Sequence, residues 1–226
     1  MIDAGPIYLT LKIAGATVGI LLVIATPIAW WLARTRARWR AVAEAAVALP
    51  LVLPPTVLGF YLLLLLGPKG PIGAPFVAWT GSSLTFSFAG LVVASVIYSL
   101  PFAVQPLQGA FEAVGRTAGE AAAMLRARPL DAFLTVAVPM ARRGFLTAAV
   151  LTFAHTLGEF GVVLMVGGNI PGETRVISIA IYEQVEKLDY ATAHALSAGL
   201  IAFSFVVLLL VYAFNRRFPI VMGARR

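Results

Sequence analysis

The chain has 226 residues, of which 60% are hydrophobic and only 12% charged, and its mean hydropathy is +0.92. A soluble domain carries about twice that charged fraction, so the composition excludes an ordinary soluble protein and indicates an integral membrane protein. The formal charge of +7 does not indicate a nucleic-acid partner, because the basic residues cluster beside the ends of hydrophobic runs. Cysteine is absent, which excludes disulfides and thiol chemistry.

Five hydrophobic stretches are long enough to cross a bilayer, which takes roughly 20 helical residues. The first has no basic residues before it and is too long for the core of a signal peptide, so we expect it to be retained. A loop rich in Gly and Pro over 67–83 and an amphipathic segment over 176–189 lie between later stretches. The sequence therefore predicts an all-α, polytopic bundle of transmembrane helices, with spans at about 7–33, 41–66, 84–107, 145–166 and 191–214.

The second stretch contains Pro50, Pro54 and Pro55. Proline removes a backbone donor and clashes with the preceding turn, so a helix kinks or ends there. One interpretation is a simple kink, and the other is a broken helix that lines a pathway.

The distribution of Lys and Arg predicts the orientation of the chain. Thirteen of these residues lie after the first span, between the third and fourth spans and in the tail, against three in the remaining loops. Positive residues are retained on the cytoplasmic side. We therefore expect the N-terminus outside and the C-terminus in the cytoplasm.

The sequence shows no internal repeat, and five spans cannot divide into two equal halves, which is unfavourable for an inverted-repeat transporter. Five spans also leave little room for a closed pathway within one chain. Because cyclic pairs are the commonest assembly, we expect a homodimer with the pathway on its axis.

A polar stretch over 120–139 lies between long apolar runs. Its first half is rich in helix formers, with Glu120 at the front, where a carboxylate suits the helix dipole. Pro129 then forces a turn. A helix, a bend and a second short helix would make a compact surface for a soluble partner, and a basic loop resting on anionic headgroups is the alternative.

This stretch resembles the cytoplasmic signature loop of ABC importer permeases, which starts with Glu-Ala-Ala and ends with apolar-x-apolar-Pro. The matching residues are Glu120, Ala121, Ala122, Val136, Val138 and Pro139. The departure is Arg126, where the family usually has Gly in the turn between two short helices. Since Arg cannot take a positive φ cheaply, we expect a different local shape there, or a contact between Arg126 and the partner.

A second group of residues resembles the molybdate branch of these permeases. It comprises Gly158-Glu159-Phe160-Gly161 in the fourth span and Asn-Ile-Pro-Gly-Glu-Thr over 169–174 in the next loop. The sulfate branch usually has Tyr after the Glu and departs in the second half.

The fourth span also contains the polar residues His155 and Glu159. An unpaired carboxylate in a span costs at least ~2.5 kcal/mol, so Glu159 should face the bundle interior or a wet cavity. His155 lies one helical turn before it, on the same predicted face. Because a fixed negative charge repels a dianion, we interpret Glu159 as a gating hydrogen-bond group or as a cap for a helix break at Gly158 and Gly161. The candidate gate is His155, Gly158, Glu159, Phe160 and Gly161.

The predicted outer turn, 169–175, combines Gly for backbone freedom with Pro171 for rigidity. It is either a docking surface for a substrate-delivering protein or an ordinary turn before the amphipathic segment. The docking candidates are Asn169, Pro171, Glu173 and Arg175.

The resemblance implies a single permease domain over 1–226 with a coupling loop over about 108–142, in a bacterial inner membrane. It implies an ATP-binding subunit on the coupling loop, a periplasmic oxyanion-binding protein outside, and molybdate or tungstate as cargo. No Gly-x4-Gly-Lys-Ser/Thr loop occurs, so we expect ATP hydrolysis in another subunit and no enzymatic activity here. With only two histidines we expect no metal site and no cofactor. The alternatives are a sulfate or thiosulfate permease of the same class and an ATP-independent secondary transporter.

Overall fold

A computed structural model describes residues 4–115, 124 and 126–216, and every regular element in these ranges is helical, as predicted. The elements run α1 (Gly5–Arg34), α2 (Arg40–Val52), α3 (Pro55–Leu66), α4 (Gly73–Thr80), α5 (Phe88–Val114), α7 (Pro129–Ala132), the π-helix η1 (Phe133–Ala137), α8 (Val138–Met140), α9 (Arg142–Leu157), α10 (Gly161–Gly167), α11 (Ile177–Glu186) and α12 (Tyr190–Arg216).

Three of these helices, α1, α5 and α12, are long and apolar enough to cross a membrane alone. Two bent pairs reach the same length, α2 with α3 and the 129–140 helices with α9, so the described residues hold up to five spans. The predicted number of spans agrees with this upper figure.

The second predicted span is broken between α2 and α3, which meet at 109°. Leu53 and Pro54 have extended backbones with ψ of 136° and 134°, the conformation that a following proline imposes. Pro50, in contrast, stays inside α2. The break is therefore caused by Pro54 and Pro55 and not by Pro50.

Two of the predicted boundaries were wrong. The fourth span does not run unbroken over 145–166, because α9 ends at Leu157 and α10 starts at Gly161. The helix of the third span does not end near 107, because α5 continues to Val114. Apolar residues recur along 108–114, and Phe111 is buried in the core, so packing extends this helix beyond the predicted span.

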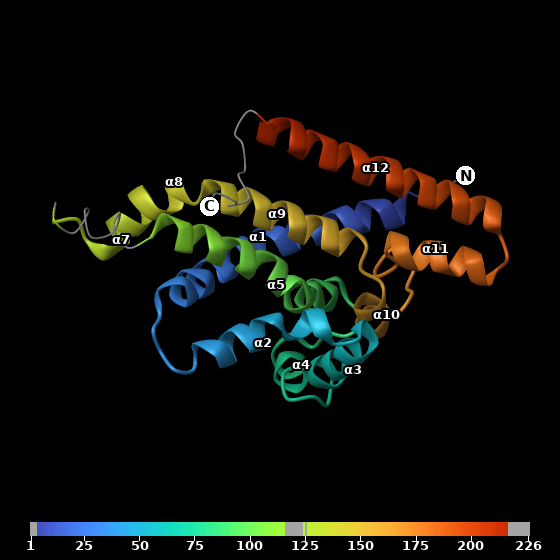
Figure 1. Cartoon of the computed structure of the whole chain (residues 1–226). Coiled ribbons are helices and arrows are strands. Elements are labelled where there is room, and N and C mark those ends of the chain that lie inside the picture. The colour runs from blue at the N-terminus through green and yellow to red at the C-terminus, as the bar shows by residue number, and fades with distance from the viewer. Residues whose placement is uncertain (1–3, 116–123, 125, 217–226) are drawn as a thin grey trace.

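The core is built where α1, α5 and α9 pack together (Figure 1). Close approach of α5 and α9 depends on Gly144, where an added Cβ would lie 2.3 Å from Ala110 Cβ. The buried residues of this core are Leu21, Ala25, Ala29, Leu32, Ala103, Val104, Leu107, Phe111, Ala141 and Ala148.

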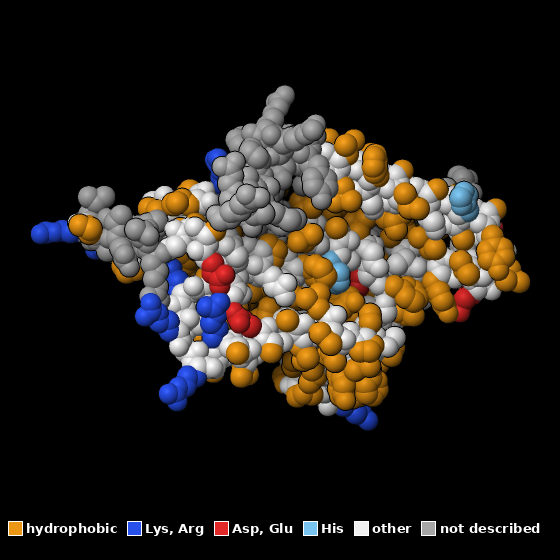
Figure 2. All heavy atoms as spheres, in the orientation of Figure 1, with side chains coloured by type: hydrophobic (Ala, Val, Ile, Leu, Met, Phe, Trp, Pro, Cys, Tyr) orange, Lys and Arg blue, Asp and Glu red, His pale blue; other side chains and the backbone are white. Residues whose placement is uncertain are grey.

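The two ends of the bundle differ in charge. The N-terminus lies at the end that carries α11, and α7 lies at the opposite end (Figure 1). Most of the Lys and Arg side chains visible in Figure 2 gather at the α7 end, which is the end predicted to face the cytoplasm. The outermost helix is α12, and only 6% of its 18-residue apolar stretch is buried within the chain. Lipid or another chain must therefore cover the rest of this stretch.

Candidate functional site

The two helix breaks meet in space. Gly161, the first residue of α10, packs against Pro55, the first residue of α3, so that an added Cβ would lie 2.9 Å from Pro55 Cβ. One turn further along α3, a Cβ on Gly59 would lie 2.8 Å from Met165 Cβ. Small residues therefore allow α3 and α10 to approach closely, and they join the broken second span to the interrupted fourth span.

Glu159 lies in the α9–α10 interruption and is 4% exposed. Its backbone carbonyl accepts a hydrogen bond from Ser178 Oγ at 2.6 Å. Neither carboxylate oxygen makes a hydrogen bond of ordinary geometry with a described residue, nor does the buried Ser95 Oγ. The predicted inward position of Glu159 is therefore observed, and Ser95 of α5 is the polar side chain nearest to satisfying its carboxyl.

His155 connects α9 to α5 instead of to Glu159. Its Nδ1 lies 2.9 Å from Ser99 Oγ, which in turn lies 3.1 Å from Thr156 Oγ1. Its ring stacks on Phe102, with centroids 4.1 Å apart. The expected placement of His155 and Glu159 one turn apart on a single helix is not observed, because α9 ends at Leu157, two residues before Glu159. Sequence reasoning did not single out Ser99, because a lone serine in a span carries little signal.

The two other gate candidates frame the interruption. Gly158 is exposed and ends α9, and Phe160 precedes α10 with a non-helical backbone (φ −129°, ψ −62°). The Phe160 ring packs on Tyr182 of α11 at 5.0 Å. Through Phe160 and Ser178, α11 therefore contacts the interruption.

The 169–175 turn is held by a polar network. Arg175 Nε donates to Asn169 Oδ1 at 2.7 Å and lies 3.3 Å from Glu183 Oε2, while Lys187 also pairs with Glu183. The hydrogen bond from Lys187, helped by the one from Asn169 and by the charge of Arg175, lowers the pKa of Glu183 below its usual 4.5. Asn169 and Arg175 thus shape the turn.

The remaining docking candidates, Pro171 and Glu173, are exposed at the tip of the turn. Gly172 has φ +80°, a conformation that suits glycine. Thr174, which the sequence did not single out, is fully buried and its Oγ1 accepts from Ile170 N at 3.1 Å.

The predicted coupling residues fall into two groups. Glu120, Ala121 and Ala122 lie outside the described residues. Arg126 has φ +60°, so the expectation that Arg would avoid a positive φ was wrong, and this residue adopts the left-handed conformation that favours glycine. Pro139 lies in α8, and the π-helix before it belongs to a class of irregular turns common at functional sites.

Aromatic side chains fix the helices that follow the coupling turn to the core. Phe133 of η1 lies 4.8 Å from the Trp30 ring of α1 and 6.0 Å from the Phe111 ring of α5. The 129–140 segment is therefore packed onto α1 and α5 at the α7 end of the bundle.

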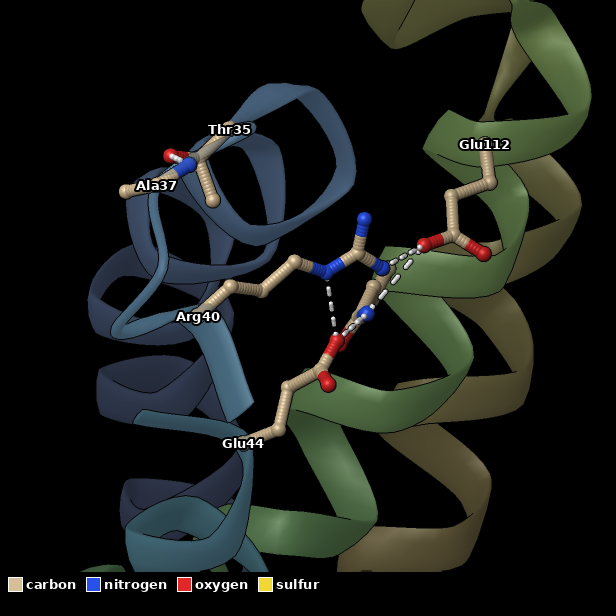
Figure 3. Close-up of polar contacts among 6 residues, drawn as sticks. Thr35, Ala37, Arg40, Glu44 and Glu112 are labelled. Carbon is tan, nitrogen blue, oxygen red and sulfur yellow. Dashed lines mark hydrogen bonds and ion pairs between the residues drawn. The ribbon is translucent and has the colours of Figure 1, made fainter. Parts of the chain in front are cut away.

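A polar cluster that sequence reasoning missed joins α2 to α5 near the same end (Figure 3). Arg40 Nε contacts Glu44 Oε1 at 2.8 Å, and Arg40 Nη2 contacts Glu112 Oε1 at 2.7 Å. Gln108 Nε2 donates to both glutamates, at 2.8 and 3.2 Å. The i, i+4 spacing within each helix was visible in the sequence, but the pairing between helices was not. Among the described residues no group of three or more metal-ligating side chains is found.

The described residues form a bundle of apolar helices, two of them broken, around a buried carboxyl, an architecture typical of polytopic membrane proteins. Residues 25–219 match the family described as binding-protein-dependent transport system inner membrane component, and the chain belongs to this family. It is therefore a multi-pass inner-membrane protein, and its fold is that of an ABC importer permease.

Comparison with individual proteins gives the same family. The chain is 60% identical over 216 residues to the molybdenum transport system permease protein ModB of Azotobacter vinelandii, covering 96% of this chain and 95% of that protein. It is 33% identical over 204 residues to the sulfate transport system permease protein CysT of Synechocystis sp., covering 90% and 70%. A solved bacterial ABC transporter involved in alginate import superposes with a TM-score of 0.75 at 17% identity, over 95% of this chain and 79% of that chain.

Proposed function

We propose that this chain is the permease subunit of an ATP-driven importer for molybdate or tungstate. The observation that carries the proposal is the 60% identity to a molybdenum permease across almost the whole chain, against 33% to a sulfate permease. Sulfate or thiosulfate import is therefore the second candidate. An ATP-independent transporter is disfavoured by membership of a binding-protein-dependent family.

In this proposal ATP is hydrolysed by a separate subunit that binds the 120–139 segment. The absence of a P-loop from the sequence and the packing of 129–140 at the Lys- and Arg-rich end support this assignment. Two copies of the chain would enclose the pathway, and the little-buried α12 leaves apolar surface for lipid or for a second copy.

The gate in this proposal is the junction of the two breaks. Unwound backbone within a bundle is tolerated where it lines a cavity, and it supplies free dipoles to a passing ion. Gly161 and Pro55 set the spacing, Gly158 and Phe160 frame the opening, and His155 holds α9 to α5 through Ser99. The Glu159 carboxylate would repel a dianion, so it gates the pathway and does not bind the cargo.

On the outer side, a periplasmic oxyanion-binding protein would deliver the cargo. Pro171 and Glu173 are the residues of the turn free to contact it, because both are exposed at the tip. Asn169 and Arg175 contribute indirectly, since their side chains hold the turn against Glu183.

The test is reconstitution of the chain with its ATP-binding subunit and binding protein in proteoliposomes, with uptake of labelled molybdate measured under competition. Uptake that requires ATP and falls with excess tungstate but not sulfate supports the proposal. Competition by sulfate at equal concentration would move the assignment to the second candidate. Uptake without an ATP-binding subunit would contradict the ABC mechanism altogether.

A further inference from the structure

We propose that Arg40 is a positioning residue that transmits movement of the coupling segment to the gate through α2. This inference rests on the proposed function and extends it to a part of the chain that no motif identifies. It starts from the four-residue cluster of Arg40, Glu44, Gln108 and Glu112 (Figure 3), called here the Arg40 cluster.

The Arg40 cluster joins the ends of two helices. Arg40 is the first residue of α2, and Glu112 lies two residues before the end of α5 at Val114. The chain that follows α5 is the proposed coupling segment. A displacement of that end of α5 would therefore be passed to α2 through the contact between Glu112 and Arg40.

The geometry is that of a connected network. One guanidinium contacts both carboxylates through different nitrogens, and the Gln108 amide donates to the same two oxygens. An isolated exposed ion pair contributes little, but a network in which each member has two partners fixes a relative orientation. The cluster carries two acids and one base, so the removal of Arg40 leaves like charges facing each other across the two helices.

The other end of α2 reaches the gate. Its 13 residues make a helix about 20 Å long, after which Leu53 and Pro54 lead directly into α3. Pro55 there packs against Gly161 in the fourth-span interruption. Rotation of α2 about its cytoplasmic end would thus shift Pro55 relative to Gly161.

The burial of its residues indicates that α2 contributes more to the position of α3 than to the stability of the bundle core. Among its residues only Pro50 is fully buried, although Ala43 and Val47 lie against the core at its edge. Apart from these two residues α2 is held to the bundle mainly by the Arg40 cluster and by its link to α3. Loss of the Arg40 cluster should free one end and leave the packed α1, α5 and α9 core in place.

The experiment compares Arg40→Glu, Arg40→Glu combined with Glu112→Arg, and the control Arg38→Glu in reconstituted transporter. Arg38 is a nearby exposed cation outside the cluster, so the control makes the same charge change without breaking it. The readout is the number of ATP molecules hydrolysed per oxyanion transported. We expect Arg40→Glu to raise this ratio about two- to thirtyfold, the range of typical coupling energies, while the ATP-binding subunit still co-purifies.

The double variant restores a cation facing two carboxylates and should return the ratio towards the wild-type value, and Arg38→Glu should leave it unchanged. The inference is overturned if Arg40→Glu hydrolyses the same number of ATP molecules per oxyanion as wild type. It is also overturned if the double variant does not bring this number back towards the wild-type value. A change as large in Arg38→Glu would also overturn it, since net charge and not the contact would then be responsible.

A second measurement separates failure of this inference from failure of the proposed function. The chain has no native cysteine, so spin labels at Val42→Cys and Ala113→Cys report the α2–α5 distance in the membrane without any transport assay. We expect a broadened distance distribution in Arg40→Glu and a narrow one in the double variant. Absence of ATP-dependent uptake by wild type would contradict the proposed function, whereas an unchanged distance distribution would contradict the Arg40 contact alone.

Discussion

Pro55 and Gly161 touch so closely that a β-carbon on Gly161 would lie 2.9 Å from Pro55 Cβ and 3.5 Å from the Thr56 backbone nitrogen. Each residue starts the second half of an interrupted helix. The contact therefore places two irregular stretches of backbone side by side, in the part of the bundle where the proposed pathway needs them.

Replacing Gly161 with Ala should lower both stability and transport. The added methyl has no space without movement of Pro55, and such overpacking costs about 1–3 kcal/mol. The measurement is ATP-dependent uptake together with the midpoint of thermal unfolding in detergent. Gly19→Ala, in α1 with open space around the added Cβ, serves as the control and should not destabilise. Equal effects of the two substitutions would contradict the close contact.

Replacing Arg126 with Gly should stabilise the coupling turn. Arg126 has φ +60°, and the left-handed conformation costs a non-glycine residue about 1 kcal/mol, which glycine avoids. We expect slower amide exchange in the residues around 124–130, measured by mass spectrometry. Arg128, with φ −67°, provides the matched control, since Arg128→Gly gains no conformational relief and should speed exchange. Faster exchange in Arg126→Gly would mean that the arginine side chain makes a contact stronger than the backbone strain.

The outer turn should loosen in acid because Glu183 has a lowered pKa. A carboxyl whose folded pKa is lowered stabilises fully above its unfolded value, here near 4.5, and this contribution is lost as the pH falls through the lower folded pKa. Amide exchange in 169–175, corrected for intrinsic rates, should therefore be constant from pH 8 to pH 5 and rise below 4.5. At pH 7, Glu183→Gln should raise exchange about two- to fivefold, as expected for partly exposed ion pairs.

Glu173→Gln is the matched control for this prediction, because Glu173 is an exposed carboxyl in the same turn. It should leave exchange unchanged at pH 7. A pH response that persists in Glu183→Gln would assign the acid sensitivity to another group.

Replacing Glu159 with Gln distinguishes its two interpretations. If the carboxyl gates transport, the amide should reduce uptake about tenfold, or ~1.4 kcal/mol, with no loss of thermal stability, because the isostere fits the same buried space. If the residue only caps the helix break, uptake should stay near wild type. A fall in the unfolding midpoint with proportionate loss of uptake would indicate a structural role.

The sequence predicted what depends on local pattern. Long apolar runs located the spans, and Pro54 and Pro55 marked the break that separates α2 from α3. The interruption at Gly158–Phe160 was predicted only as one of two interpretations of Glu159, because it contains no proline, and isolated glycines inside an apolar run are compatible with a continuous helix. Gly158 and Gly161 were singled out both by the family resemblance and as the possible site of a helix break.

Contacts between side chains that lie far apart in the sequence could not be predicted from the spacing of residues along one helix. Arg40 was counted only for orientation, although it bonds Glu112, and His155 was assigned to Glu159 although it bonds Ser99. Arg175 was interpreted as a docking residue, but most of its described contacts are to Asn169 and Glu183 within the chain. Each pairing depends on how helices pack against one another, which no spacing along a single helix specifies.

The sparse packing of α12 has a consequence for how the protein is assembled during synthesis. This helix follows α1, α5 and α9 in the chain and is synthesised after them, and among the described residues it makes its main helix contacts with α11. The α1, α5 and α9 core can therefore close before α12 leaves the ribosome, and the insertion of α12 is driven by its own hydrophobicity. Biogenesis then has two stages, in which a pre-formed bundle of α1, α5 and α9 receives α12, whose exposed faces are left for lipid or another chain.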